Sequence, residues 1–340
     1  MSGGLPARQR VIGGTSLLSL QVPVRGRTVR VRLKMEAENC FGSIKARTAE
    51  ALLGSLEAAG RLGPGNRVVE STSGNLGVAL AGLCAERGYR CTLVVEPSTP
   101  QHSVDRMVAH GADVVVVREV AGGRTLTARL DAVRDILASD GTAVWTDQYE
   151  NPANPWVHRW STAAELAQAV PRGRLDAVSV AVSTGGTLAG IAGYFREHRP
   201  EARLLAVDAV GSAALGGAPD DRPFKLPGFG SGQRSRFLTG GQWDRAFTLH
   251  DVHAAVACRR IATSTGVRLG GSGGAAVLAA LLHAQDTPAV SQVACICPDA
   301  GEKYEQIYAH PLPAPPEAGQ RVLAALDNLA AARLENGEPQ

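Results

Sequence analysis

From residue 66 onward, short runs of β-branched residues alternate along the chain with alanine- and leucine-rich amphipathic segments. This alternation is typical of βαβ units on a mostly parallel sheet, and it predicts an α/β fold. The predicted strands span residues 67–70, 91–96, 113–117, 142–146, 176–182, 203–210 and 293–297. The predicted helices span residues 75–87, 104–110, 124–138, 161–169, 187–198, 252–265 and 273–284. An earlier segment, 28–36, alternates apolar and polar residues, which predicts an antiparallel or edge strand.

A break in this pattern near residues 151–155 (NPANP) separates two sets of βα units. We therefore expect two lobes and a terminal segment: a smaller lobe over 37–149, a larger lobe over 10–36 and 150–320, and a C-terminal helix and tail over 321–340. The loop at 214–240 is rich in Gly, Pro and Arg and has little periodicity. Long ordered loops in compact enzymes are often functional.

The composition is that of an ordinary globular protein. With 340 residues, 44% of them hydrophobic and 20% charged, the chain can bury a large core without disulfides or metal ions. Its formal net charge of +3 is too small to indicate a nucleic-acid partner. No apolar run approaches the roughly 20 residues that cross a bilayer, and the first residues lack the apolar core of a signal peptide. We therefore expect a cytoplasmic protein without a membrane partner.

Six cysteines are scattered through the chain, at positions 40, 84, 91, 258, 295 and 297. They have neither the density of a secreted disulfide scaffold nor the spacing of zinc ligands. Cys295 and Cys297 lie two apart in the apolar run VACIC, which places both on one face of a predicted strand. We interpret them as reduced core residues and expect no metal site, with a metal or redox role as the alternative.

Lysine is rare in this chain: of 35 basic residues only four are lysine, and the other 31 are arginine. A bias toward arginine codons explains most of this, but each remaining lysine raises the question of whether arginine could replace it. Lys45 lies at the start of a predicted helix in the stretch ENCFGSIKARTAEALL. The partial positive charge of a helix N-terminus lowers the pKa of a lysine, which favours the free amine needed for covalent catalysis on carbonyl compounds. An ordinary solvated lysine is the alternative.

Three turns at predicted helix starts are rich in glycine and hydroxyl side chains. The turn STSGN at 71–75 offers N–H and hydroxyl groups to a carboxylate or similar anion, and STGGT at 183–187 offers the same groups to a phosphate. The third turn, GGSGG at 270–274, carries a single hydroxyl, on Ser272. Simple helix capping is the alternative for STSGN, and a flexible turn with a helix N-cap is the alternative for GGSGG. The turn STGGT matches neither the Walker nor the dinucleotide-binding pattern, which disfavours ATP and NAD.

Taken together, these elements resemble the fold-type II pyridoxal-phosphate enzymes, specifically the cysteine synthase family. The resemblance covers about residues 12–310 and rests on the stretches VIGGTSLLSL, LKMEAENCFGSIKAR, ESTSGNLGVALA, DQYENPANPWVH, STGGTLAG, LPGFGSG and GGSGGAAV. It implies two open, twisted α/β lobes with pyridoxal phosphate in the cleft between them. The larger lobe would bind the cofactor, and the smaller lobe would carry the loop for the substrate carboxylate. Members of the family usually pair as homodimers, so the implied partners are small amino-acid substrates and a second copy of the chain.

The resemblance also implies roles for particular residues. Lys45 would hold the cofactor covalently and then act as the base that removes the substrate Cα proton, which arginine cannot do because it is never deprotonated. Asn75 would hydrogen-bond the cofactor's 3-oxygen, and Ser272 would meet the pyridine nitrogen. The other implied contacts are phosphate binding by Ser183, Thr184, Gly185, Gly186 and Thr187, α-carboxylate binding by Ser71, Thr72, Ser73 and Gln148, and substrate contact by Gly228. The implied reaction is β-replacement, in which an O-activated serine loses its leaving group and a second nucleophile adds.

Part of the chain resembles a narrower subgroup of this family. The loop at 207–217 followed by KLPGFGSGQRSRF is similar to enzymes that make N-(2-amino-2-carboxyethyl)-L-glutamate from O-phosphoserine and glutamate, a step toward 2,3-diaminopropionate in siderophore and antibiotic biosynthesis. Tyr149 and Ser183, which add hydroxyl groups, fit that subgroup as well. Because both substrates are anionic, we expect arginines near the site, and the candidates are Arg129, Arg234 and Arg236.

The sequence departs from the common family pattern at Cys40, where proline is usual, and at Ala46, where aspartate or cysteine is common. These departures motivate one alternative, a catalytically silent regulatory relative. Within the same chemistry, the alternative is an ordinary cysteine synthase that uses sulfide. Lys225 occupies a basic position of the family's substrate loop, whereas Lys34 and Lys303 have no assigned role.

Overall fold

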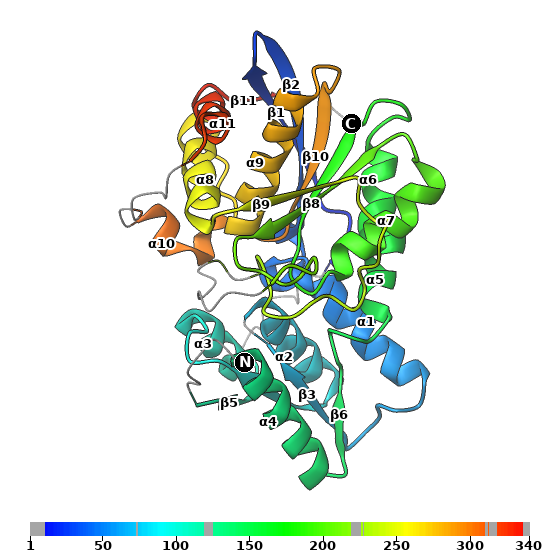
Figure 1. The fold of residues 1–340 in the computed structure, drawn as a ribbon. Helices are drawn as coiled ribbons and strands as arrows, with labels where there is room; N and C mark the ends of the chain where they lie inside the picture. The colour runs from blue at the N-terminus through cyan, green and yellow to red at the C-terminus, as the bar shows by residue number, and fades with distance from the viewer. Residues whose placement is uncertain are drawn as a thin grey trace, which may run out of the picture.

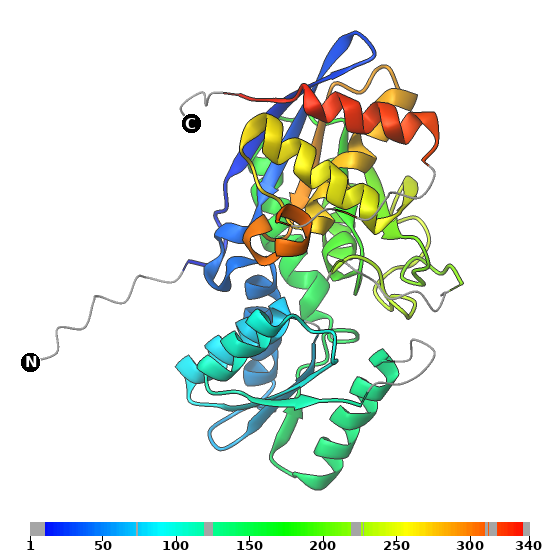
Figure 2. The ribbon, with the colours of Figure 1, turned by 90° about the vertical axis from the view of Figure 1, so that its left-hand side faces the viewer.

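A computed structural model of the protein describes residues 11–72, 74–118, 125–218, 226, 228–309, 312 and 318–335. It contains two separate β-sheets, of seven and four strands, and each sheet is covered by helices on both faces (Figure 1). The predicted α/β fold is therefore confirmed. Figure 2 shows the two sheets one above the other in the same elongated molecule.

The four-stranded sheet is entirely parallel. Its strand order is β5 (Asp113–Val116), β4 (Arg90–Val95), β3 (Arg67–Ser71) and β6 (Ala143–Trp145). One face packs against α1 (Lys45–Ala58), α2 (Asn75–Arg87) and α3 (Gln101–Ala109), and the other packs against α4 (Thr125–Ser139). The central strand β3, with the sequence RVVES, is buried on both faces from Val68 to Ser71, so Glu70 and Ser71 are polar residues inside the sheet.

The seven-stranded sheet is mixed. Its order is β11 (Arg333–Leu334), β1 (Leu17–Val24), β2 (Arg27–Met35), β10 (Gln292–Cys297), β7 (Ala177–Ala181), β8 (Arg203–Ala209) and β9 (Arg245–Leu249). The pairs β11–β1 and β1–β2 are antiparallel. The pairs β2–β10, β10–β7, β7–β8 and β8–β9 are parallel. α8 (Asp251–Thr265), α9 (Gly271–Asp286) and α11 (Gln320–Ala330) cover one face, whereas α6 (Ala164–Ala169) and α7 (Gly186–His198) cover the other.

Short helical segments complete the chain. They are the 3-10 helices η1 (Glu36–Glu38), η2 (Cys40–Gly42) and η4 (Gly301–Lys303), the helices α5 (Ala153–Val157) and α10 (Glu305–Tyr308), and the π-helix η3 (His158–Ala163). Among the described residues, no helix is long and apolar enough to span a bilayer.

The structure corrects several details of the predicted elements. The segment at 28–36 pairs antiparallel with β1, as predicted, but β2 is an interior strand because β10 pairs with its other side. The strands β1, β9 and β11 were not predicted, and the helix predicted at 161–169 begins inside η3. β1 and β2 form a hairpin whose two turn residues, Arg25 (φ 48°) and Gly26 (φ 79°), both have positive φ. That geometry matches the twist of the flanking strands, but arginine gives no turn signal in the sequence.

The cysteines lie where the apolar pattern places them. Cys295 and Cys297 are fully buried in β10, and among the residues that the structure describes none of the six cysteines forms a disulfide. Burial raises the pKa of both thiols in β10, so they remain protonated. The interpretation as reduced core residues is confirmed.

Candidate active site

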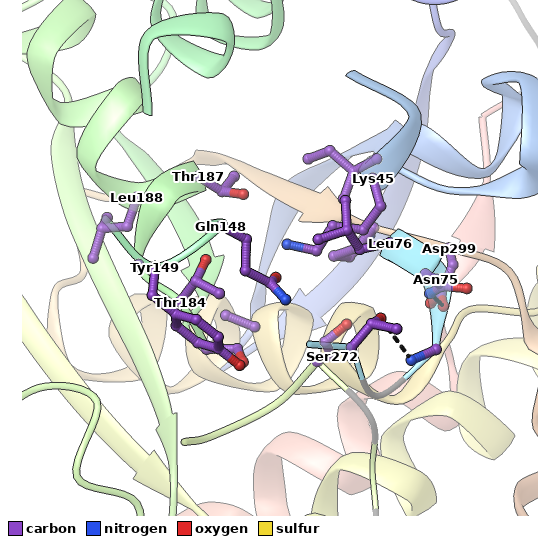
Figure 3. Close-up of a pocket in the computed structure, with 18 residues that line it drawn as sticks. Lys45, Asn75, Leu76, Gln148, Tyr149, Thr184, Thr187, Leu188, Ser272 and Asp299 are labelled. Atoms are coloured by element: carbon purple, nitrogen blue, oxygen red, sulfur yellow. Dashed lines mark hydrogen bonds between the residues drawn. The ribbon is translucent and has the colours of Figure 1, made fainter. Parts of the chain in front are cut away.

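A cavity opens between the two sheets, where the carboxyl ends of parallel strands from both sheets face each other (Figure 3). Its walls are the residues after β3, β6, β7 and β10 and the first residues of α1, α2, α7 and α9. Such crevices at strand carboxyl ends are the usual ligand sites of open α/β sheets. Of the residues predicted to form the site, the structure places in the walls Lys45, Thr72, Asn75, Gln148, Tyr149, Ser183, Thr184, Gly185, Thr187, Gly228 and Ser272.

Lys45 is the first residue of α1, and its side chain extends into the cavity (Figure 3). Burial lowers the pKa of its amine to about 8, although the negative charge of Glu70 opposes this change. Within the described part of the chain, no hydrogen bond or ion pair holds its Nζ. An amine with this pKa is partly deprotonated at neutral pH and can act as a nucleophile or a base.

The turn after β3 is built around Thr72. Its Oγ1 accepts hydrogen bonds from the backbone N–H groups of Gly74 (3.2 Å) and Gly77 (3.1 Å), so this hydroxyl caps the start of α2. Gly74 has a φ of 152°, in the region that favours glycine. The side chain of Ser71 does not line the cavity, and Ser73 lies outside the described residues.

Gln148 and Tyr149 follow β6, the strand that pairs with β3, so they lie at the same edge of the sheet as the turn after β3. Gln148 Nε2 donates to the carbonyl of Ser71 at 2.6 Å, and the backbone N–H of Gln148 donates to the carboxylate of Glu70 at 3.0 Å. Glu70 is fully buried and also accepts hydrogen bonds from Thr146 Oγ1 and the backbone N–H of Ser71. Glu70 therefore fixes the two segments that approach the cavity from β3 and β6, although burial raises its pKa to about 7.

The turn between β7 and α7 depends on two glycines. At Gly185 (φ 87°) a Cβ atom would lie 2.1 Å from Ser235 Oγ, and at Gly186 it would lie 2.3 Å from Asn154 Oδ1. Both distances are shorter than real Cβ contacts, so a side chain at either position would have to displace Ser235 or Asn154. The first N–H groups of a helix have no partner within the helix and favour an anion. Gly186 itself does not line the cavity.

Ser272 lies in the first turn of α9, on the opposite side of the cavity from Lys45 in Figure 3. Only 2% of its surface is exposed. The preceding Gly271 packs directly against Leu226, because a Cβ on that glycine would lie 2.7 Å from the leucine side chain. Ser272 therefore presents one neutral hydroxyl to the cavity.

The three candidate arginines lie in different environments. Arg129 on α4 is 5% exposed and does not itself line the cavity. It hydrogen-bonds the hydroxyl of Tyr149, whose pKa is raised to about 12 by burial despite that cation. Its Nε and one of its Nη atoms have no partner among the residues that the structure describes. Arg234 is exposed and does not line the cavity, and Arg236 pairs with Glu150 at 3.0 Å on the surface. Lys225 lies outside the described residues.

The sequence interpretation missed three charged residues of the site: Glu70, Asp299 and Lys303. Asp299 follows β10 and lines the cavity beside Asn75, and Lys303 contacts Asn75 from the other side. The rarity of lysine was the only signal for Lys303. No local pattern distinguishes Glu70 or Asp299 from ordinary charged residues at strand ends.

The chain matches the sequence profile of a protein family described as "Pyridoxal-phosphate dependent enzyme" over residues 8–299. It is 38% identical over 296 residues to N-(2-amino-2-carboxyethyl)-L-glutamate synthase of Ralstonia nicotianae, with 86% of each chain covered. It is 32% identical over 295 residues to cysteine synthase of Staphylococcus aureus, with 87% of this chain and 94% of that relative covered. The crystal structure of O-ureido-L-serine synthase superposes with a TM-score of 0.81 at 31% identity, covering 94% of this chain and all of that one.

Proposed function

The chain belongs to the family of pyridoxal-phosphate-dependent enzymes, and from this premise we propose that it joins O-phospho-L-serine to L-glutamate. The reaction is a β-replacement. The Cβ–O bond of phosphoserine breaks, phosphate leaves, and the α-amino nitrogen of glutamate forms a bond to Cβ with loss of a proton. The product is N-(2-amino-2-carboxyethyl)-L-glutamate, the compound for which the Ralstonia nicotianae relative is named.

The residues around the cavity fit pyridoxal phosphate. Lys45 offers a buried amine for covalent attachment, and Ser272 offers a neutral hydroxyl to the pyridine nitrogen. The phosphate group would lie at the start of α7, where Gly185 and Gly186 bring the backbone close and Ser183, Thr184 and Thr187 add hydroxyls. When bound, the cofactor supplies an electron sink that weakens the substrate Cα–H bond. A hydroxyl at Ser272 does not hold the ring nitrogen protonated as a carboxylate does, which favours elimination over transamination.

Lys45 moves the proton at Cα. Lys45 would hold the cofactor through its amine, and a free Lys45 amine with a pKa of about 8 could accept the Cα proton near neutral pH. The same ammonium can return a proton to Cα after the nucleophile has added.

The substrate carboxylate would lie at the turn after β3, beside Thr72 and Gln148, with Ser71 and Ser73 in the same turn. Glu70 holds the Gln148 and Ser71 backbone there, so the carboxylate site is preorganised by one buried side chain. We propose that residues 37–149 act as a smaller lobe that closes on this carboxylate against the larger lobe, residues 10–36 and 150–320. Closure would exclude water from the reacting atoms.

Preference for anionic substrates rests on one observation: the buried guanidinium of Arg129, which has unpartnered N–H groups among the described residues. A buried cation without a full set of acceptors is costly unless a ligand supplies them. Tyr149 joins Arg129 to the cavity wall, and Ser183 adds a hydroxyl across the cavity. Phosphate and carboxylate oxygens suit these donors, whereas sulfide gives them no comparable partner.

The decisive experiment supplies the enzyme with O-phospho-L-serine or O-acetyl-L-serine together with L-glutamate or sulfide and identifies the products by mass spectrometry. We expect the glutamate adduct from phosphoserine. The variant Arg129→Met should lower kcat/KM for phosphoserine and glutamate by about a hundredfold. The reason is that the substrate's anionic oxygens lose the hydrogen bonds of a buried guanidinium. The matched control is Arg134→Met, which removes an exposed arginine from the same helix and should leave kcat/KM unchanged.

Two other outcomes would overturn this proposal in different ways. Cysteine from acetylserine and sulfide, with no glutamate adduct, would identify a cysteine synthase, the activity for which the Staphylococcus aureus relative is named. A colourless protein from which borohydride traps no cofactor on Lys45 would identify a catalytically silent regulatory relative.

We also propose that the enzyme works as a cytoplasmic homodimer and that its product is a precursor of 2,3-diaminopropionate for a siderophore or antibiotic. The family resemblance supports the dimer, and the nature of the product supports the pathway. Sedimentation of the holoenzyme tests the first, and metabolite profiling after deletion tests the second: a monomer, or an unchanged diaminopropionate pool, would contradict them.

A further inference from the structure

Asp299 and Lys303 hold the two ends of the Asn75 side-chain amide. Asn75 Nδ2 donates a hydrogen bond to Asp299 Oδ2 at 2.7 Å, and Lys303 Nζ donates one to Asn75 Oδ1 at 2.9 Å. Figure 3 shows Asn75 and Asp299 side by side at the edge of the cavity. Flipping the amide would place its oxygen against a carboxylate and its nitrogen against an ammonium, so this pair of charges permits one orientation only.

Asp299 is itself fixed from several sides. Only 1% of its surface is exposed, and its Oδ2 also accepts a hydrogen bond from the hydroxyl of Tyr304 at 2.7 Å. Its backbone pairs with Ser43, and its carbonyl accepts from the N–H of Gly270 at 3.1 Å. Its second carboxylate oxygen, Oδ1, packs against Gly270: a Cβ atom on that glycine would lie 1.9 Å from Oδ1. The carboxylate therefore has little freedom to turn away from Asn75.

Lys303 connects this amide to the segment that precedes Lys45. Its Nζ donates a second hydrogen bond, to the carbonyl of Gly42 at 2.7 Å. Burial lowers the pKa of Lys303, and the negative charge of Asp299 opposes that change. One ammonium group thus fixes both Asn75 and the turn from which α1 begins.

We propose that Asp299 and Lys303 are positioning residues that fix the Asn75 amide so that its remaining N–H faces an oxygen of the bound cofactor. The Nδ2 group has two N–H donors, and Asp299 takes one of them. The other is left for an acceptor in the cavity, which suits the anionic 3-oxygen of pyridoxal phosphate. This inference rests on the proposed contact of Asn75 with the cofactor and is independent of which nucleophile the enzyme uses.

The test measures cofactor binding without any substrate. Pyridoxal phosphate is titrated into the apoenzymes of the wild type, Lys303→Met, Lys303→Arg, Asp299→Asn and Asn75→Ala, and the dissociation constant and absorption spectrum are recorded. We expect Lys303→Met and Asp299→Asn to weaken binding by about tenfold, because the Asn75 N–H would no longer be held toward the charged 3-oxygen. The same loss should shift absorbance between the visible and near-ultraviolet bands of the bound cofactor. Lys303→Arg should restore most of the affinity. Glu305→Gln, which neutralises an exposed carboxylate at the start of α10, is the matched control and should bind like the wild type.

A double-mutant cycle separates positioning from a general structural effect. If Lys303 acts through Asn75, Lys303→Met should cost much less affinity in the Asn75→Ala background than in the wild type. Equal costs in both backgrounds, or wild-type affinity and spectra for Lys303→Met and Asp299→Asn, would overturn the inference. If Lys303→Met does not fold, the same cycle with Asp299→Asn decides the matter. Wild-type binding by Asn75→Ala would instead contradict the proposed role of Asn75 itself.

Discussion

Lys34 and Lys45 lie in opposite environments inside the protein. Lys34 on β2 is 2% exposed, and its Nζ donates to the carbonyl of Thr15 at 2.6 Å and to Glu165 at 2.7 Å. Lys45 on α1 faces the cavity, with no ion pair in the described part of the chain. Lys34 Nζ has its full set of acceptors. Lys45 Nζ has none among the described residues, so its lone pair is available when the amine is deprotonated.

The ion network around Lys34 also fixes the helix that carries Lys45. Arg47, two residues after Lys45, hydrogen-bonds Glu36 at 2.7 and 3.0 Å and Glu165 at 2.6 and 2.7 Å. Burial would raise the pKa of Glu165, but hydrogen bonds from Arg47 and Lys34 outweigh it and lower this pKa to about 2. A fully paired set of charges therefore anchors the first turn of α1, while the adjacent unpaired amine is free to react. The comparison indicates that burial favours a reactive amine only where, as at Lys45, no acceptor within the described residues holds the ammonium form.

The largest expected effect comes from Lys45→Arg. A guanidinium stays protonated and cannot attach the cofactor or remove a proton, so turnover should fall by at least about a thousandfold. Borohydride reduction followed by peptide mapping should find cofactor on Lys45 in the wild type and on no peptide of the variant. As a control, Arg134→Lys adds an exposed lysine, which should remain unlabelled. Equal labelling of another lysine in Lys45→Arg would show that the unpaired amine is not special.

Disrupting the ion network of Arg47 with Glu36 and Glu165 should lower the stability of the fold. Arg47→Met leaves Glu36 and Glu165 buried without their main partner, and we expect the free energy of unfolding to fall by about 3–5 kcal/mol. Arg134→Met removes an exposed pair with Asp131 and should cost less than about 0.5 kcal/mol. Urea unfolding at a fixed cofactor concentration measures both. Similar costs for the two variants would mean that the network is not an anchor.

The smallest expected effect is a pH dependence that tests the lowered pKa of Lys45. Because only the free amine attacks the cofactor, the rate at which apoenzyme recombines with pyridoxal phosphate should rise with pH and level off above the pKa of Lys45, about 8. The rate should rise about fivefold between pH 7 and pH 8. Stopped-flow absorbance measures it, and the same reaction with Nα-acetyl-lysine corrects for titration of the cofactor itself. A rate that keeps rising tenfold per unit beyond pH 9 would place the Lys45 pKa at an ordinary value.

Much of the fold and part of the site could be predicted because their signals are local. The runs of β-branched residues predicted the inner strands, and the turns STSGN and STGGT predicted polar groups at the starts of α2 and α7, where they lie. The strands β1 and β9 were missed, although β1 carries an alternating apolar pattern, LLSLQVPV, and β9 is only five residues long. Arg129 was proposed from charge alone, and only packing against Tyr149 distinguishes it from the exposed Arg234.

By itself, the sequence determined the α/β alternation, the glycine-rich turns and a lysine at the start of a helix, because each depends on backbone preferences within a few residues. The tertiary structure alone decided which charges meet. Asp299 and Asn75 are 224 residues apart, and Arg47 and Glu165 are 118 apart, yet each pair is in hydrogen-bonding contact. Hydrogen bonds act over about 3 Å, so their partners are set by how the two sheets pack and not by any spacing along the chain.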